Sequence, residues 1–337
     1  MKALRVAVLM VGAAVPAFSQ DNPLEPKEWT VPWERSRPRD PIQDKTGRVW
    51  FVGQTGNYIA YLNPQSGEFK QYSIDAGTNP HNIVVDNDNG VWYTGNRNNR
   101  LVRLIPETGE LKTYPIPDST VRDPHTMIFD KSGIAWFTAQ GSQRIGRFDP
   151  KTGEFKLWRP SQQRSNPYGV VVDGNGVPYF ILFGTNRIAS VDPRTLEYKE
   201  FVMPDSLSRG RRLAVTSDNT LWFGDYRGFL GHLDPKTGKF EEFPLPSGRQ
   251  AGPYAMTQDD QDRVWLVEAN QQPNKLIAFD TKTKQWVANI EIPMNGAQRN
   301  TIRHMTFNRA TRELWFGTDA GTIGRIKVPV EIKKLTP

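Results

Sequence analysis

Short runs of β-branched and aromatic residues alternate along this chain with clusters of glycine, proline, asparagine and aspartate. Residues 124–158 show the pattern once through. Pro-His-Thr-Met-Ile-Phe and Ile-Ala-Trp-Phe-Thr are separated by Asp-Lys-Ser-Gly, and Arg-Ile-Gly-Arg-Phe-Asp is separated from Glu-Phe-Lys-Leu-Trp by Pro-Lys-Thr-Gly. Apolar runs of this length between turn residues are typical of β-strands, and the unit lacks the 3.6-residue period of a helix. It therefore predicts four short strands.

The same unit recurs seven times, and each copy carries an aromatic residue in its second predicted strand. These marker aromatics are spaced by 42, 44, 43, 43, 43 and 50 residues. They are Trp50, Trp92, Trp136, Tyr179, Trp222, Trp265 and Trp315. Four strands in about 43 residues match one blade of a β-propeller. The sequence predicts an all-β, seven-bladed β-propeller with four antiparallel strands per blade, in which the marker aromatics pack between blades.

The seventh unit is incomplete, because it ends after a third predicted strand at residues 322–328. Residues 27–32, Lys-Glu-Trp-Thr-Val-Pro, are similar to residues 112–117, Lys-Thr-Tyr-Pro-Ile-Pro, which end the second unit. An open ring would leave two sheet edges without partners. We therefore expect the N-terminal strand to join the last blade as its outer strand and to close the ring.

The first residues have the features of a secretory signal peptide. Lys2 and Arg5 precede an uncharged stretch, and Ala17-Phe18-Ser19 places small residues at the two positions that determine cleavage. The uncharged stretch is too short to span a membrane. We predict a signal peptide at residues 1–19, the propeller at 20–330 and a C-terminal tail at 331–337. We expect the mature protein to be periplasmic or secreted, without a membrane span.

The amino-acid composition of the chain argues against several classes of function. The 337 residues include no cysteine, which excludes disulfide frameworks, iron–sulfur clusters and thiolate zinc sites. The net charge is +7, and it becomes +5 without Lys2 and Arg5. The basic residues are scattered among acidic ones, whereas nucleic-acid binding needs a clustered basic face. We expect no nucleic-acid partner, and we expect a monomer.

One position in each unit is occupied by a large polar side chain. It lies eleven residues before the marker aromatic, at the start of the first strand, which lines the central channel of a propeller. We call it the ring position. Its occupants are Arg39, His81, His125, Tyr168, Arg211, Tyr254 and His304. Polar groups that converge on one axis predict a binding pocket. The alternative is a channel mouth in which these side chains hydrogen-bond to one another for stability alone.

Three carboxylates are expected near the same rim. Asp123 lies two residues before its ring position, and Asp225 and Glu268 follow their marker aromatics by three residues. A histidine pair with one or two carboxylates can bind a divalent cation or transfer protons near neutral pH. Asp123 and Glu268 are the candidate metal ligands, whereas Asp225 has Arg211 or Arg227 as a possible ion-pair partner. The fourth histidine, His232, falls on a third strand and is expected to be structural.

These repeats resemble those of the virginiamycin B lyase family, over essentially the whole mature chain. The likeness rests on residues 79–83, Asn-Pro-His-Asn-Ile, with 91–94, Val-Trp-Tyr-Thr, and on residues 123–125, Asp-Pro-His, with 136–138, Trp-Phe-Thr. The resemblance implies a seven-bladed propeller that uses Mg²⁺ and a histidine of the central face. It also implies that a cyclic peptide ester is opened by elimination, in which an α-proton is removed and a C–O bond breaks without water.

Only some of the site residues of the family have equivalents in this sequence. The family has histidines in Pro-His segments of two consecutive blades, which corresponds here to His81 and His125. Asp123 stands where the family has one glutamate, and Ala139 stands where it has the other. The family carries its pair in the last two blades. The same positions of those blades here hold Tyr254 and His304, with Ile302 and Thr318 in place of the glutamates.

Three functions are compatible with these residues. The first is a carbon–oxygen lyase with His125 as base, His81 orienting the substrate or a metal ion, and His304 as a further catalytic candidate. In this reading Arg39, Tyr168, Arg211 and Tyr254 bind the substrate, a small molecule or peptide ester with an anionic group. A guanidinium can bind a carboxylate through two parallel hydrogen bonds. The second is a lactonase-type hydrolase, which would need a metal-activated water. The third is a propeller that binds a ligand or protein without catalysis, because this fold serves all three purposes.

Overall fold

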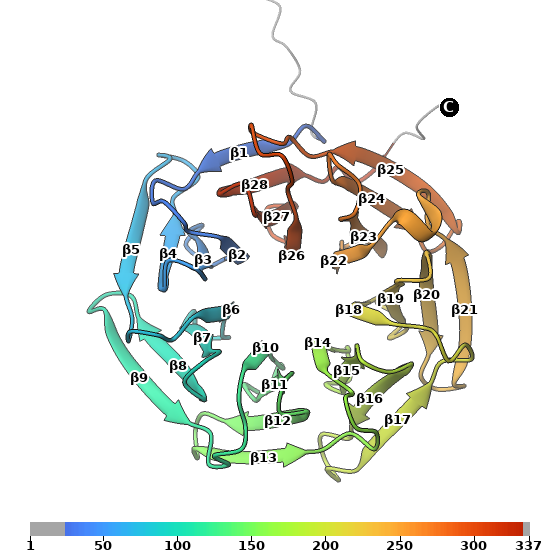
Figure 1. The fold of residues 1–337 in the computed structure, drawn as a ribbon, viewed down its shortest axis with the longest axis horizontal. Helices are drawn as coiled ribbons and strands as arrows, with labels where there is room; N and C mark the ends of the chain where they lie inside the picture. Colours follow the sequence, from blue (N-terminus) through green and yellow to red (C-terminus); the bar gives the residue numbers. More distant parts are fainter. Residues whose placement is uncertain (1–23, 333–337) are drawn as a thin grey trace, which may run out of the picture.

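The computed structural model describes residues 24–332, which form seven four-stranded antiparallel sheets arranged in a ring around a central axis (Figure 1). We call the region enclosed by the first strands the channel. Each sheet is one blade, and its first strand lies next to the channel. The predicted all-β, seven-bladed architecture is confirmed. The predicted signal peptide at 1–19 and the last five residues of the tail lie outside the described residues. Within residues 24–332 we find no helix with the length and apolarity needed to span a membrane.

The strands follow one another from the channel outward in each blade. Blades one to four are β2 (Pro38–Gln43), β3 (Val49–Gly53), β4 (Tyr58–Leu62) and β5 (Phe69–Ser73); β6 (Pro80–Val85), β7 (Val91–Gly95), β8 (Arg100–Ile105) and β9 (Glu110–Pro115); β10 (Pro124–Phe129), β11 (Ala135–Ala139), β12 (Arg144–Asp149) and β13 (Glu154–Trp158); β14 (Pro167–Val172), β15 (Pro178–Leu182), β16 (Arg187–Val191) and β17 (Tyr198–Val202). Blades five to seven are β18 (Gly210–Val215), β19 (Leu221–Asp225), β20 (Phe229–Asp234) and β21 (Lys239–Pro244); β22 (Pro253–Gln258), β23 (Arg263–Glu268), β24 (Lys275–Asp280) and β25 (Gln285–Glu291); β26 (Ile302–Asn308), β27 (Glu313–Thr318), β28 (Thr322–Lys327) and β1 (Lys27–Thr30). A single 3₁₀ turn, η1 (Gly248–Gln250), precedes β22.

The N-terminal strand closes the ring, as predicted. In blade seven the strand order is β26, β27, β28 and β1, and Lys27 pairs with Arg325 while Thr30 pairs with Thr322. Trp29 of β1 stacks on the marker aromatic Trp315 at 5.6 Å between ring centroids. Backbone pairing and apolar contact together join the first described strand to the last blade.

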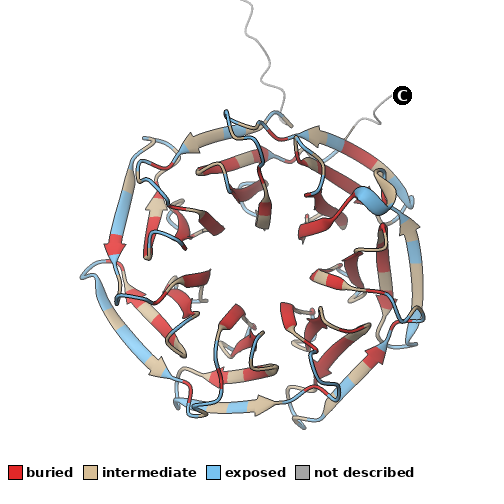
Figure 2. Ribbon diagram, viewed as in Figure 1, coloured by how far each residue is buried: buried red, intermediate tan, exposed pale blue. Residues whose placement is uncertain are grey.

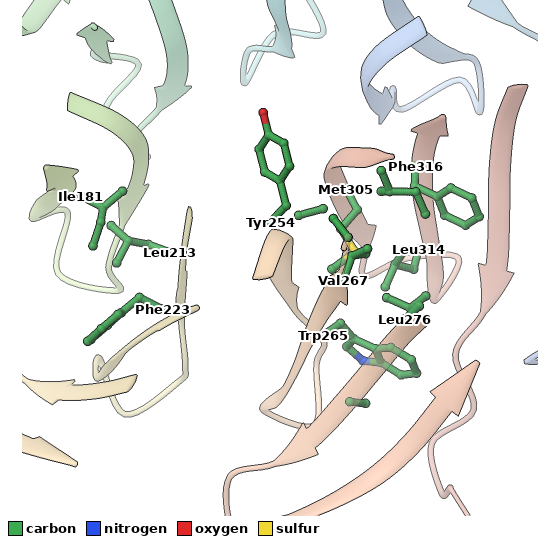
Figure 3. Close-up of a cluster of buried hydrophobic side chains, with 14 of the residues drawn as sticks. Ile181, Leu213, Phe223, Tyr254, Trp265, Val267, Leu276, Met305, Leu314 and Phe316 are labelled. Atoms are coloured by element: carbon green, nitrogen blue, oxygen red, sulfur yellow. The ribbon is translucent and has the colours of Figure 1, made fainter. Parts of the chain in front are cut away.

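Burial falls from the channel side to the outside (Figure 2). Every residue of the second strand β11 is buried, whereas the outer strand β9 alternates between exposed and half-buried positions. The marker aromatics all lie on second strands, and Trp265 packs with Val267, Leu276 and Leu314 between blades six and seven (Figure 3). The expectation that these aromatics form the core between blades is confirmed.

The indole N–H of most marker tryptophans donates to an aspartate six residues earlier. Trp136 Nε1 donates to Asp130 Oδ2 at 2.9 Å, and the same bond links Trp265 to Asp259 at 2.9 Å. Each aspartate also accepts backbone N–H groups of its own turn. Asp130, for example, accepts those of Ser132 and Ile134. A buried donor thereby gains a partner, and the turn between the first two strands is fixed relative to the core.

Candidate functional site

Six of the seven ring positions come together at the channel, each as the second residue of a first strand. The rings of His81 and His125 lie 3.6 Å apart, and His125 lies 4.1 Å from the ring of Tyr168. Tyr168 Oη is 2.6 Å from Tyr254 Oη. The Arg211 guanidinium lies 4.3 Å from the Tyr254 ring centroid. Side chains from five different blades therefore form one continuous lining.

Blade seven corrects one of our predictions. Thr306 pairs with Trp315 nine residues later, whereas Thr257 of blade six pairs with Trp265 eight residues later. The turn between β26 and β27 thus contains one extra residue, and counting eleven residues back from Trp315 reaches the wrong position. Ile302 pairs with Thr318 as Pro253 pairs with Glu268. Arg303, not His304, therefore occupies the seventh ring position.

Contacts agree with that assignment. Arg303 Nη1 lies 3.4 Å from Tyr254 Oη, within hydrogen-bonding distance. His304 lies one residue further along β26 and lines a cavity of about 290 Å³ together with Arg212 and Met305. Burial lowers the pKa of His304 to about 3, with a further contribution from Arg212. His304 is therefore a neutral group behind the ring, and its Nδ1 has no hydrogen-bond partner among residues 24–332.

A second layer of polar side chains lies behind the ring, and the sequence analysis missed it. Every first strand has a β-bulge directly after its ring position, for example between Pro124 and Met127. A bulge breaks the strict alternation of side chains and can turn a residue toward the same side as its neighbour. Arg212 accordingly reaches Thr126 Oγ1 at 3.3 Å and Asp40 Oδ2 at 3.9 Å. The sequence did contain a signal for this second layer, because polar residues directly follow several of the ring positions.

The histidine pair is buried and neutral. His81 Nδ1 lies 3.1 Å from the backbone oxygen of His125, and His125 Nδ1 lies 2.9 Å from Thr126 Oγ1. Burial lowers the pKa of both imidazoles well below the ordinary value, and the nearby guanidinium groups of Arg39 and Arg212 lower it further. Neither Nε2 atom forms a hydrogen bond within residues 24–332, so both rings keep a ring nitrogen for a ligand.

The opposite side of the channel carries cations and phenols. The Arg211 guanidinium lies within 5.2 Å of four aromatic ring centroids, which belong to Tyr168, Phe183, Tyr226 and Tyr254. Such contacts stabilise a cation through the negative face of each ring. Arg211 Nε has no hydrogen-bond partner in the described part of the chain. This arginine is held in place by ring contacts while one of its N–H groups remains available.

Arg39 joins the two sides. Its side chain is 5% exposed, and its Nη1 donates to Gln54 Oε1 at 3.1 Å. Its Nε and Nη2 have no hydrogen-bond partners within residues 24–332. Buried N–H groups normally find an acceptor, and an unpaired one is costly. Arg39 therefore has two donors without a hydrogen bond among the side chains of the channel, although its Nε lies 3.7 Å from Asp40 Oδ1.

The predicted metal ligands are not assembled with the histidines. Asp123 Oδ1 and Oδ2 accept the Gly141 N–H at 2.7 and 2.9 Å. Glu268 accepts the N–H and hydroxyl of Ser247. Burial raises the pKa of Asp123 to about 6, although the amide of Gly141 opposes the shift. Asp123 binds a loop of its own blade, Glu268 binds the segment that joins blade five to blade six, and neither carboxylate contacts His81 or His125.

Other predicted residues also have structural explanations. Asp225 pairs with Arg227 at 3.0 Å, one of the two partners that we anticipated. His232 lies on the third strand β20 and stacks on Trp222 at 4.4 Å, away from the channel. Asp123 has a positive φ of 50°, a conformation that asparagine, aspartate and glycine adopt most readily. Its carboxylate type is therefore explained by the backbone and by its bond to Gly141.

The residues present do not fit the magnesium ion that the resemblance implies. Within residues 24–332, no group of three or more histidine, aspartate or glutamate side chains is placed to bind a metal ion. Asp123 and Glu268 bind loop groups, Asp40 and Asp319 are paired with arginines, and arginines lie near the histidines. Asp123 and Glu268 thus do not form a common metal site in this structure.

Comparison with known proteins supplies the family. Residues 85–336 match the model of the virginiamycin B lyase family. This chain belongs to that family. A virginiamycin B lyase from Staphylococcus aureus has a similar structure, with a TM-score of 0.80, 21% identity and coverage of 90% of this chain and 99% of that chain. The structure of a catalytically inactive S. aureus virginiamycin B lyase with quinupristin is equally similar.

More distant propellers share the fold. The extracellular domain of a hybrid two-component system from B. thetaiotaomicron matches with a TM-score of 0.68 and 16% identity, over 93% of this chain and 44% of that chain. A comparison with functionally curated proteins found no match. At these identities the structural likeness establishes the propeller fold, and the activity must be argued from the pocket of this family member.

Proposed function

We propose that this member of the virginiamycin B lyase family is a carbon–oxygen lyase that opens an ester by elimination in its central channel. The observation that carries the proposal is the pocket lining. Two neutral histidines in ring contact lie beside Arg39, which presents unpaired N–H groups. A neutral imidazole can accept a hydrogen bond or a proton, and a desolvated guanidinium can stabilise a developing oxyanion.

The charge of the pocket favours an anionic substrate. Four guanidinium groups surround the channel, and two carboxylates lie within reach of them. The four are Arg39, Arg211, Arg212 and Arg303, and the carboxylates are Asp40 and Asp319. An excess of positive charge in a buried site attracts a carboxylate, which a guanidinium can bind through two hydrogen bonds. We therefore assign a carboxylate-bearing ester, linear or cyclic, as the substrate class.

The proposed reaction needs no water. A basic side chain of the channel takes the proton from the carbon next to a carbonyl. The electron pair of the broken C–H bond forms a C=C bond to the neighbouring carbon, and the C–O bond of that carbon breaks with its pair on oxygen. Arg39 stabilises the enolate that develops at the carbonyl and the carboxylate that departs. His81 and His125 contact the reacting ester and orient it. No step is assigned to a metal ion.

Mass spectrometry of the products in ¹⁸O water tests the proposal. We would incubate the purified protein with a panel of carboxylate-bearing linear esters, lactones and cyclic depsipeptides. An elimination gives products with a new C=C bond and no ¹⁸O, whereas hydrolysis by a lactonase-type enzyme incorporates one ¹⁸O atom. The variant His125→Gln should lower turnover by at least 10²-fold. The matched control is His232→Gln, because that histidine lies outside the channel.

A ligand-binding propeller without catalysis is the second candidate. The observation that favours it is the engagement of Asp123 and Glu268 in loop contacts, which leaves the pocket without the acids of the family pattern. In that case the ester panel gives no product, while calorimetry still detects a carboxylate ligand whose affinity falls on Arg39→Gln. This outcome would replace the lyase by a binding function of the same pocket.

The location and assembly of the protein are part of the proposal. We propose that it is exported and acts as a monomer outside the cytoplasm. The closed ring supports the second point, because β1 pairs with β28 within the same chain. Cell fractionation together with light scattering of the mature protein tests both points, and a cytoplasmic protein or a stable oligomer would contradict them.

A further inference from the structure

Tyr254 has unusual surroundings for a phenol. It is the second residue of β22 and is 7% exposed. Its ring lies at the edge of the apolar cluster between blades, and its hydroxyl points away from Trp265 (Figure 3). The hydroxyl lies 2.6 Å from Tyr168 Oη and 3.4 Å from Arg303 Nη1. A buried phenol oxygen is therefore aimed at the polar side of the pocket.

More hydrogen-bond donors than acceptors surround the hydroxyl oxygen of Tyr254. Arg303 can only donate, and Tyr168 can donate its own hydroxyl proton, so Tyr254 Oη can accept both bonds. Two accepted hydrogen bonds suit a phenolate better than a phenol, because a phenol also needs an acceptor for its own O–H proton. Arg211 lies 4.3 Å from the Tyr254 ring and Arg39 is nearby, so that positive charge faces Tyr254 on several sides.

The titratable groups that face Tyr254 come from four strands: Tyr168 from β14, Arg211 from β18, Arg303 from β26 and Arg39 from β2. The partners of these groups lie around them. Arg211 also contacts Tyr226 after β19, and Arg303 pairs with Asp319 after β27. Arg212 contacts the Tyr168 ring, Asp40 pairs with Arg39, and His304 is a neighbour of both Arg212 and Asp40. Asp319 is paired with Arg303 and Asp40 with Arg39 and Arg212. Glu268, on the strand paired with β22, is held by Ser247. The cations in this set outnumber the acids.

We propose that Tyr254 is the proton acceptor of the pocket, with Tyr168 donating a hydrogen bond to its oxygen and the arginines acting as counter-ions. The assignment rests on the proposed elimination for its catalytic part. The phenolate oxygen of Tyr254 takes the proton from the carbon next to the carbonyl, forming an O–H bond as the C–H bond breaks. The released electron pair forms the C=C bond, and the C–O bonding pair leaves on the departing carboxylate.

Acid–base properties separate Tyr254 from the histidines. Burial raises the pKa of a phenol, but the charges of Arg39 and Arg211 outweigh burial and bring that of Tyr254 down to about 8. Burial raises the pKa of Tyr168 to about 12, so Tyr168 keeps its proton and remains a donor. A base works best when its pKa lies near the working pH. His125, with a pKa well below the ordinary value, is a weaker base than a Tyr254 phenolate.

Ultraviolet difference titration of the mature protein tests the phenolate without any substrate. We expect one tyrosine to ionise near pH 8, before the other tyrosines, whose ordinary pKa is about 10. Tyr254→Phe should remove that early step, and Arg211→Met should move it to higher pH. Tyr226→Phe is the matched control, because Tyr226 also contacts Arg211 but makes no bond to Tyr168. Absence of the early step, or its loss in Tyr226→Phe, overturns the assignment.

The catalytic role is tested on an ester that the protein turns over. We expect kcat/KM to rise with pH to a plateau with a midpoint near pH 8, and Tyr254→Phe to lower kcat by at least 10²-fold. His125→Gln should lower the rate but keep the midpoint. A midpoint that survives Tyr254→Phe overturns the catalytic role. An early phenolate in a protein that turns over no ester overturns the lyase proposal instead, so the two failures are distinguishable.

Discussion

The two sides of the channel use equivalent positions of the same repeat for opposite electrostatic purposes. On the histidine side, which consists of His81 and His125 of blades two and three, the imidazoles are uncharged. On the arginine–tyrosine side, formed by Arg211, Tyr254 and Arg303 of blades five to seven, the guanidinium groups are charged and one phenol is driven toward ionisation. Backbone position alone therefore does not set the chemistry of a side chain in this ring.

Each side determines the protonation of the other. The arginines disfavour a positive imidazole and favour a negative phenolate, because like charges repel and opposite charges attract among these buried side chains. Burial, like the arginines, lowers the pKa of the histidines, whereas it raises the pKa of Tyr254 against the effect of the arginines. The arginines decide the outcome for the phenol, and burial decides it for the histidines. The following experiments disturb one side or the other.

The largest effect is expected from acid. Burial lowers the pKa of His81, His125 and His304 in the folded state, while in the unfolded chain they titrate near pH 6.5. Below that pH the unfolded state binds up to three more protons, so stability is lost as the pH falls. The linkage amounts to about 1.4 kcal/mol per proton and pH unit, and to about 5 kcal/mol for these three histidines between pH 6.5 and 5. Asp123 opposes this loss by up to one proton, because its raised pKa of about 6 lets the folded state bind a proton in the same window. Urea unfolding at a series of pH values measures it.

Substituting the histidine side sharpens this test. The double variant His81→Gln with His125→Gln removes two of the three histidine protons from the linkage and should reduce the pH slope by the equivalent of about two protons. Asp40 does not contribute in this window, because its pKa is lowered from 3.8 and its stabilisation is lost only under more acidic conditions. A wild-type slope of less than one proton would mean that the folded protein already holds charged imidazoles.

The next largest effect is expected at Asp40, which connects the two sides. Its Oδ2 accepts the Asn82 amide at 2.8 Å and lies 3.9 Å from Arg212, while Oδ1 lies 3.7 Å from Arg39. Asp40→Asn keeps the shape and suits the positive φ of 53°, but it leaves two buried guanidinium groups without a counter-ion. We expect a loss of about 3–5 kcal/mol in the free energy of unfolding, measured by urea denaturation.

Two further variants establish the cause. Asp75→Asn removes an exposed carboxylate that pairs with Arg100 at 2.6 Å, and we expect it to cost about 0–1 kcal/mol. Adding Arg212→Met to Asp40→Asn removes one of the uncompensated charges and should recover part of the loss. If the double variant is less stable than Asp40→Asn alone, charge compensation is not the role of Asp40.

The sequence was sufficient for the architecture because each blade repeats the same short-range signals. Turn residues, strand runs and the marker aromatic identify seven units, and the likeness of residues 27–32 to the end of unit two predicts the closure made by β1. The sequence was not sufficient to predict the strand register of blade seven. The extra residue between β26 and β27 also displaces the polar partner of the marker, and Trp315 Nε1 has no hydrogen-bond partner among residues 24–332.

The ring of the site could be predicted, but its second layer could not. A strand period of two places Asp40 and Arg212 on the side opposite to their ring neighbours. The bulges break that period, and they depend on pairing between strands rather than on the identity of one residue. The engagement of Asp123 and Glu268 by neighbouring loops is likewise a tertiary property. Residue type alone therefore suggested metal ligands that the fold uses elsewhere.

A smaller effect is expected from threonines that are specific to the histidine side. Thr138 Oγ1 accepts the Thr126 N–H at 3.2 Å and donates to the backbone oxygen of Tyr168 at 2.8 Å, which links blade three to blade four. The equivalent residue of blade six is Val267. Thr138→Val leaves both buried backbone groups without this partner, and we expect a loss of about 1–3 kcal/mol in the free energy of unfolding.

The exposed Thr113 on the outer strand β9 provides the control. Thr113→Val should change stability by less than about 0.5 kcal/mol. Equal effects of Thr138→Val and Thr113→Val in urea denaturation would show that the link between blades three and four does not contribute to stability.

The smallest effect is expected at the rim of the arginine–tyrosine side. Asp319 contacts Arg303 at 2.7 Å and Arg37 at 3.5 Å, and these side chains are partly exposed. Asp319→Asn should therefore cost about 1 kcal/mol or less, and the difference should fade in about 1 M salt because solvent screens the pair. The same substitution leaves the Arg303 charge without its neutralising partner beside Tyr254, so the early phenolate step should move to lower pH. A move to higher pH would mean that Asp319 holds Arg303 in position beside the phenol, and that this position matters more for the pKa of Tyr254 than the charge of Asp319 does.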